Sequence, residues 1–204
     1  MGDPSKFSSL IEYQIAYYAI VLLILSEIVI WIFSSRGKGK EKRQFADRGT
    51  IWLIIICWCF GIMAGALFRS QSAPEFVRSW LLPHFFYYVG VVFIILGIVI
   101  RCTAVLTLKK AFTLHVQTTN DQHLIKTGLY HFVRNPAYTG SIISLLGVAL
   151  SFRSIPGAIL VIIISLICYS IRIHIEETAL FNQFHDEFEC YCKETKYRLI
   201  PRIY

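Results

Sequence analysis

Three charged residues lie at the end of the last long apolar stretch of the chain: Arg172, Glu176 and Glu177. On a helix, Arg172 and Glu176 share one face because they are four residues apart, while Glu177 points about 100° away. A guanidinium offers a planar fork of donors that can orient a carboxylate, and charges near membrane depth are costly unless they are paired or functional. Two interpretations stay open: an internal Arg172–Glu176 ion pair, and a site for chemistry.

The run 128–140 holds a second candidate, an Asn-Pro pair that precedes another apolar stretch. Asn135 can cap a helix start, and Pro136 has the backbone φ that the first helical position needs. Such a helix start presents free N–H groups and a partial positive charge, which can seat a carboxylate. The alternative is an ordinary capped membrane helix with Arg134 reaching toward the lipid headgroups.

Long apolar stretches must position these residues, since 55% of the 204 residues are hydrophobic and only 16% are charged. At about 1.5 Å per residue, four stretches are long enough to cross most or all of a hydrocarbon core of roughly 30 Å, and a shorter one makes a fifth span. We predict an all-α integral membrane protein with about five transmembrane helices, the last two forming a tight hairpin, and a cytosolic C-terminal helix. The predicted spans are 13–33, 51–68, 82–100, 137–152 and 155–173.

The distribution of Lys and Arg predicts the orientation of these spans. Six of these residues crowd segment 34–50, as expected of a cytosolic loop. Alternation then places the N-terminus outside, and segment 109–134 and the C-terminus in the cytosol, with either a bacterial plasma membrane or the endoplasmic reticulum as the host. The first stretch is expected to remain as an anchor, because this basic loop and no small-residue cleavage site follows it. These loops account for the formal charge of +7, so no nucleic-acid partner is expected.

Other residue patterns predict packing rather than chemistry. Gly61 and Gly65 form a G-x-x-x-G, which allows close approach of a neighbouring helix. The six cysteines form no C-x-x-C pair, and the six histidines have no H-x-x-H or H-x-x-x-H spacing. We therefore expect reduced thiols and no metal site.

Three motifs in the C-terminal half occur in a defined order: L-x-K-x-G-L-Y-x-x-x-R-N-P-x-Y-x-G from residue 124, then R-x-x-x-E-E-x-x-L-x-x-x-F from residue 172, and then E-x-x-x-Y with R-L-I-P-R-I at the end. Together they resemble the isoprenylcysteine carboxyl methyltransferase family, which belongs with the membrane phospholipid methyltransferases. The resemblance covers about 108–203. The chain is short enough for one membrane domain over 1–204, in which 1–107 supply N-terminal transmembrane helices. The resemblance implies that 108–204 form the cofactor-binding and catalytic half.

The resemblance also implies a cofactor, S-adenosyl-L-methionine, held between the last helices and the cytosolic segments, and a lipophilic methyl acceptor that arrives from the lipid bilayer. Arg172 falls where the family orients the substrate, so Arg172 and Glu176 are the candidate catalytic residues. The implied cofactor contacts are Gln117, Gln122, His123, Leu124, Ile125, Tyr130, Asn135, Pro136, Ala137, Tyr138 and Glu176.

Two positions depart from the family pattern. The family usually has histidine at the positions of Asn135 and Gln122, and here a histidine follows at His123. Asn135 is a replacement that can still cap a helix. Around Gln122 the register of the contacts is open by one residue.

Simple chemistry agrees with a carboxylate acceptor, such as that of a prenyl-cysteine, because a carboxylate needs an orienting cation but no general base. Phospholipid amines and small thiols are alternative acceptors that would need deprotonation. An NADPH-dependent, sterol-reductase-like enzyme is a further alternative, although Ser141 stands where an acidic residue is expected in such enzymes. A non-enzymatic membrane scaffold is the last, and the oligomeric state is left open.

Overall fold

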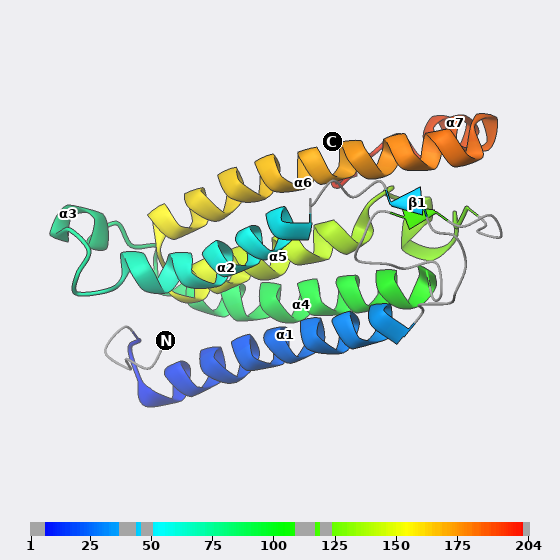
Figure 1. Ribbon diagram of the computed structural model, residues 1–204. Helices are drawn as coiled ribbons and strands as arrows, with labels where there is room; N and C mark the ends of the chain where they lie inside the picture. Colours follow the sequence, from blue (N-terminus) through cyan, green and yellow to red (C-terminus); the bar gives the residue numbers. More distant parts are fainter. Residues whose placement is uncertain (1–6, 37–43, 46–50, 109–116, 119–123, 202–204) are drawn as a thin grey trace.

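Five long helices lie side by side and alternate in direction (Figure 1). The structure is a computed structural model that describes residues 7–36, 44–45, 51–108, 117–118 and 124–201. The long helices are α1 (Leu10–Arg36), α2 (Ile51–Phe68), α4 (Phe85–Leu108), α5 (Pro136–Ser151) and α6 (Ile155–Phe184). The short elements are α3 (Glu75–Arg78), the 3₁₀ helix η3 (Gly128–His131), α7 (Asp186–Glu194) and the strands β1 (Gln44–Phe45) and β2 (Gln117–Thr118).

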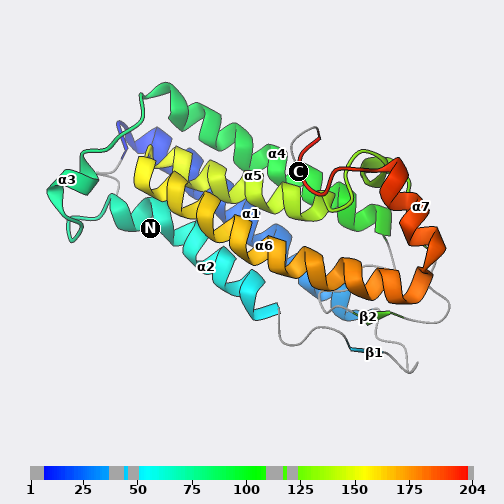
Figure 2. The ribbon, with the colours of Figure 1, turned by 90° about the horizontal axis from the view of Figure 1, so that it is seen from above.

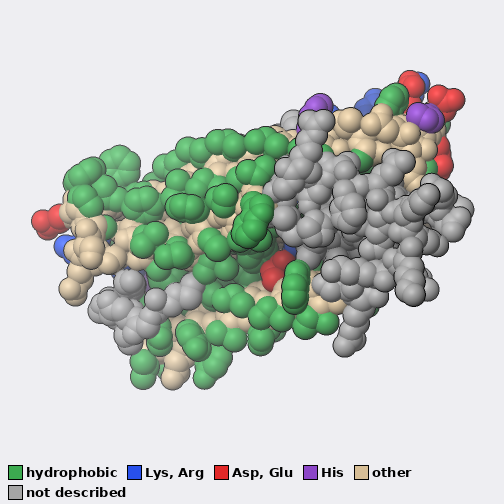
Figure 3. All heavy atoms as spheres, viewed as in Figure 1, with side chains coloured by type: hydrophobic (Ala, Val, Ile, Leu, Met, Phe, Trp, Pro, Cys, Tyr) green, Lys and Arg blue, Asp and Glu red, His purple; other side chains and the backbone are tan. Residues whose placement is uncertain are grey.

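The predicted all-helical membrane class is confirmed, with one small two-stranded ladder added to it. Among the described residues, three helical segments are long and apolar enough to cross a membrane: Leu10–Phe33, Phe85–Leu108 and Ile155–Phe184. Trp52–Phe68 and Pro136–Ser151 are shorter apolar helices, so five crossings remain a prediction. Apolar side chains cover much of the face seen in Figure 3; charged side chains lie toward both ends, and one acidic group is visible among the apolar side chains near the middle.

Two predicted boundaries of the third span are wrong. The helix begins at Phe85 rather than at residue 82, because the Leu82 amide donates to the Arg153 carbonyl at 2.9 Å. The helix also continues past residue 100 to Leu108. Arg101 does not mark the end of the span, because its charge is paired with Glu27 of α1.

The predicted hairpin of the last two spans is confirmed, with only Phe152 to Ser154 between α5 and α6. Arg153 takes a positive φ of 57° at this turn, and the Ser154 hydroxyl caps α6 by accepting from the Gly157 amide at 3.1 Å. α6 continues to Phe184, which confirms that this helix extends beyond the predicted span 155–173. The turn is therefore tight enough to keep the two helices antiparallel neighbours.

Glycines bring α4 and α5 into close contact. Gly90 and Gly97 of α4 face Gly140 and Gly147 of α5, and a Cβ atom on Gly90 would lie 2.4 Å from the Ser151 amide. The predicted packing role of Gly65 also holds, since its backbone lies against Gly157 of α6. Serines of α5 are fully buried in the bundle, as their polarity predicted.

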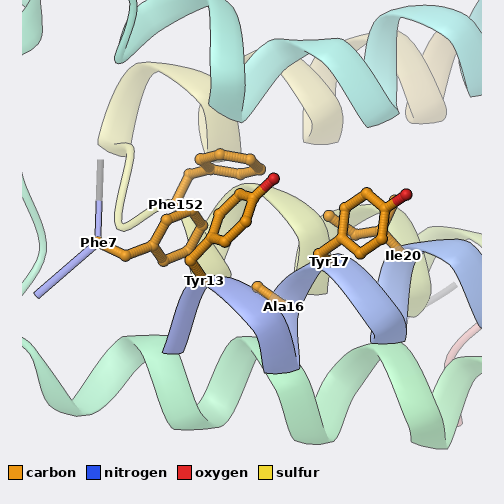
Figure 4. A pocket seen from close by; sticks show the side chains of 6 residues that line it. All are labelled: Phe7, Tyr13, Ala16, Tyr17, Ile20 and Phe152. Atoms are coloured by element: carbon orange, nitrogen blue, oxygen red, sulfur yellow. The ribbon is translucent and has the colours of Figure 1, made fainter. Parts of the chain in front are cut away.

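Aromatic side chains join α1 to the hairpin turn, as Figure 4 shows. Phe7 and Phe152 lie 5.3 Å apart between ring centroids, and Tyr13, Ala16, Tyr17 and Ile20 complete a small hollow there. These contacts fix the end of the bundle at which α1 begins and near which α3 lies.

Polar segments gather at the opposite end, where Figures 1 and 2 show α7, β1 and β2. β1 and β2 pair antiparallel, with Gln44 opposite Thr118 and Phe45 opposite Gln117. The two segments predicted to share one side of the membrane thus lie at the same end of the bundle.

Candidate active site

The start of α5 forms one wall of the candidate site. Pro136 is the first residue of α5, as predicted, but the Asn135 side chain makes no capping hydrogen bond, so that part of the prediction is wrong. Instead, the Asn135 carbonyl accepts from the amides of Tyr138 and Thr139 at 3.1 and 3.2 Å. The backbone amide of Asn135 donates to the Arg198 carbonyl at 2.9 Å. These amides are therefore satisfied and do not form the open carboxylate seat that was expected.

Three side chains from α5 and α6 form a hydrogen-bonded network next to this helix start. The Arg172 guanidinium donates from Nε to Glu176 Oε1 at 3.1 Å and to the Tyr138 hydroxyl at 3.2 Å. Tyr138 in turn donates to Glu176 Oε1 at 2.6 Å. The Arg172 side chain is 1% exposed and that of Glu176 is 24% exposed, so the anionic end of the network faces outward. The internal ion pair, one of the two open interpretations, is present.

A second ion-pair cluster holds the C-terminal tail against this site. Glu177 accepts from Arg134 Nε at 2.8 Å and from Arg198 Nε at 3.0 Å. Arg134 also donates to the carbonyls of Thr195 and Lys196 at 2.8 and 3.0 Å. Because Glu177 points away from Glu176 on α6, one helix turn serves both clusters.

Two tyrosines connect η3 to α7 beside the network. The Tyr191 hydroxyl donates to the Tyr130 carbonyl at 2.7 Å. Burial raises the pKa of the Tyr130 phenol, and the nearby charge of Glu176 raises it further. The Tyr130 phenol therefore stays protonated at neutral pH and can serve as a hydrogen-bond donor.

The other predicted cofactor contacts are only partly brought together. Ala137 packs with Tyr130 and Ala104 in a small buried cluster, and Pro136 is also buried. Leu124 and Ile125 are half-buried in the segment before η3. Gln117 belongs to β2, which lies against α6. The predicted contacts Gln122 and His123, like most of the basic segment 34–50, lie outside the described residues.

An ion pair beneath the site was not identified from the sequence. Arg101 of α4 donates to Glu27 of α1 from Nε and, at 2.8 Å, from Nη2, and its guanidinium lies 5.8 Å from the ring centroid of Trp58. Two opposite charges inside separate apolar stretches were the available signal, because such residues are rare unless they pair.

Comparison with known proteins places this geometry in a family. The model of the phospholipid methyltransferase family matches residues 85–187, which comprise α4, β2, η3, α5 and α6 and the beginning of α7. The chain belongs to this family. The resemblance expected from the motifs in segment 108–203 is thus confirmed. The Arg172–Tyr138–Glu176 network lies within the matched segment, as do Glu177 and Arg134 of the second cluster, whereas Arg198 lies after it.

The curated relatives carry a more specific description. Proteins of Oryza sativa subsp. indica and subsp. japonica, described as probable protein-S-isoprenylcysteine O-methyltransferases, are each 35% identical over 124 residues, or 59% of this chain and 62% of theirs. Protein-S-isoprenylcysteine O-methyltransferase B of Arabidopsis thaliana is 27% identical over 122 residues. The chain spans about 60% of the length of these relatives.

A solved structure supports the fold. The eukaryotic intramembrane Ras methyltransferase called isoprenylcysteine carboxyl methyltransferase aligns with a TM-score of 0.56 and 24% sequence identity. The alignment covers 74% of this chain and 52% of that chain. The two chains therefore share a helical arrangement over more of this chain than the matched segment 85–187.

Proposed function

We propose that the chain is an S-adenosyl-L-methionine-dependent methyltransferase that acts at the membrane on the carboxylate of a prenyl-cysteine or a similar lipid-like acceptor. The network of Arg172, Tyr138 and Glu176 is the observation that carries the proposal. It places a cation and an anion at the polar end of apolar helices, where a water-soluble cofactor and a lipid-borne acceptor can meet. Membership of a methyltransferase family and the names of the curated relatives support the same reaction.

The residues around the network fit this cofactor. When bound, S-adenosyl-L-methionine supplies a methyl group that passes to the acceptor oxygen as its carbon–sulfur bond breaks, leaving a methyl ester and S-adenosylhomocysteine. Glu176 offers a partly exposed carboxylate that can stabilise the positive charge of the cofactor. The Asn135 side-chain amide nitrogen is buried and has no partner within the described part of the chain, so it can donate to a ligand at this wall.

The acceptor site depends on Arg172. Its guanidinium can grip a carboxylate at two points and align it for in-line attack without a general base. Because the side chain is 1% exposed and bonded to Glu176, the acceptor can reach it only if Arg172 exchanges part of its present contacts. We infer that Glu176 turns toward the cofactor as the acceptor carboxylate takes its place beside Arg172.

The proposal is tested by methyl transfer from labelled S-adenosyl-L-methionine in the purified full chain. A farnesyl-cysteine acid, an aminophospholipid and a small thiol are offered separately, and the chain with Glu176→Gln serves as the impaired comparison. We expect label in the methyl ester of the prenyl-cysteine acid, released by base. Rapid methylation of the aminolipid or thiol alone would leave a methyltransferase with a different acceptor.

Binding experiments separate the remaining alternatives. S-adenosylhomocysteine should raise the melting temperature of the chain through preferential binding to the folded state, and NADPH should not. Stabilisation by NADPH alone would favour the reductase alternative. The absence of any effect from either compound, together with no methyl transfer, would favour the scaffold.

A further inference from the structure

Arg101 and Glu27 form an ion pair within the apolar part of the helix bundle. The Arg101 side chain is 4% exposed, and the Glu27 side chain is 22% exposed. Two guanidinium nitrogens, Nε and Nη2, donate to the two carboxylate oxygens of Glu27. This two-point contact fixes the orientation of both the guanidinium and the carboxylate. Such charges are costly at membrane depth, so a pair that persists there invites a functional explanation.

The third nitrogen of Arg101 reaches the candidate site. Nη1 donates to the Ala137 carbonyl at 3.2 Å, and the Ser141 hydroxyl donates to the same carbonyl at 3.2 Å. Ala137 lies in the first turn of α5, directly before Tyr138. Arg101 therefore connects a carboxylate on α1 to the turn that carries the Arg172–Tyr138–Glu176 network.

Close packing prevents this connection from shifting freely. A Cβ atom on Gly140 would lie 2.7 Å from the Arg101 amide, so the backbones of α4 and α5 are in contact at this level. The guanidinium thus acts over a fixed separation between the helices. Its hydrogen bond ends on the Ala137 carbonyl, which belongs to the peptide unit that leads into Tyr138.

We propose that Arg101, oriented by Glu27, is a positioning residue that fixes the first turn of α5 for cofactor binding and methyl transfer. The inference rests on the proposed function and extends it to a residue pair that touches neither reactant. The simpler reading is that the pair only fastens α1 to α4. A natural comparison is a second contact made by α1, in which Glu12 Oε1 lies 2.9 Å from Nε2 of His84, the residue before α4.

Substitutions at these two contacts distinguish the two roles. Arg101→Lys keeps the charge beside Glu27, but one ammonium cannot reproduce the fork that also reaches Ala137. We expect it to weaken S-adenosylhomocysteine binding, or to lower kcat, by roughly tenfold or more, since small displacements remote from the chemistry have such effects. Glu12→Gln is the matched control, and we expect it to leave both quantities unchanged even if the melting temperature falls.

Calorimetry and acceptor kinetics on the purified full chain provide the measurement. An Arg101→Lys chain that melts lower yet binds and turns over like the wild type would show a fastening role and overturn the inference. If that variant does not fold, Glu27→Asp keeps the charge pair while drawing the guanidinium away from Ala137, and wild-type affinity there overturns the inference equally. A wild-type chain that binds no S-adenosylhomocysteine overturns the proposed function, and this inference with it.

Discussion

The Tyr138 hydroxyl donates a hydrogen bond of 2.6 Å to the Glu176 carboxylate, although the two residues are 38 positions apart on separate helices. This contact joins the first turn of α5 to the turn of α6 that also carries Arg172. The geometry at the start of α5 therefore depends on the charge of Glu176 on α6. Changes at Glu176 should therefore affect ligand binding as well as the local packing.

Glu176→Gln should weaken S-adenosylhomocysteine binding more than it weakens folding. The amide preserves the shape of the side chain and can still accept from Tyr138, but it deletes the negative charge. Loss of a charge-assisted contact should cost about 1.5–3 kcal/mol of binding free energy. Calorimetry on the purified chain measures this directly.

The matched control for this change is Glu187→Gln, which neutralises the exposed partner of Lys126 at the start of α7. We expect unchanged affinity there, because an exposed ion pair contributes little. Equal affinities of wild type and Glu176→Gln for the ligand would exclude a countercharge role for Glu176.

Arg172→Lys should not fully rescue the methyl-transfer activity that Arg172→Ala removes. An ammonium can remain paired with Glu176, but it cannot grip an acceptor carboxylate at two points. We expect kcat/KM for a prenyl-cysteine acid to stay at least about tenfold below wild type. Arg172→Ala should in addition destabilise the fold by roughly 3–5 kcal/mol, since it removes one partner of a largely buried pair.

Melting temperatures and kinetics measured on both variants separate these effects. A lysine variant with wild-type kcat/KM would contradict the two-point grip, whatever its stability. A lysine variant as inactive as the alanine variant but with wild-type stability would place the whole role of Arg172 in the chemistry.

Glu177→Gln should loosen the C-terminal tail. Glu177 holds both Arg134 and Arg198 with a side chain that is 12% exposed, so neutralisation weakens two charge-assisted hydrogen bonds by about 2 kcal/mol or more in total. Limited proteolysis should then cleave within 195–201 faster than in the wild type. Glu189→Gln, which changes an exposed pair with Lys193 on α7, should leave the cleavage rate unchanged.

Local patterns made several parts of this fold predictable. The bounds of α2 agree with the predicted span, because a basic segment precedes it and Arg69 follows it. The hairpin was predictable from the short polar turn near Arg153, and the Arg172–Glu176 pair from its four-residue spacing. In each case, residues close in sequence determine the structure.

Partners distant in sequence account for what was missed. Glu27 and Arg101 are 74 positions apart, and neither residue alone indicates which charge it meets. The backbone carbonyl of Arg198, in the C-terminal tail, accepts a hydrogen bond from the backbone amide of Asn135, so this helix start differs from an isolated Asn-Pro cap. Glycines repeat every seven residues on α4 and on α5, but only the packing shows that the two sets face each other.

The contact between these glycines predicts a difference between two alanine substitutions. Gly97→Ala should destabilise the bundle by roughly 1–3 kcal/mol, because the new Cβ would lie 2.5 Å from the Gly140 carbonyl oxygen and the Ser144 amide of the neighbouring backbone. Gly61→Ala is the matched control, since the nearest atoms to its Cβ would be side-chain atoms of Leu145, at 2.9 Å and beyond, which can rotate away. Thermal unfolding in detergent should show a lower melting temperature for Gly97→Ala than for Gly61→Ala. Equal melting temperatures would mean that α4 and α5 can separate at this level, and that Arg101 does not act over a fixed distance.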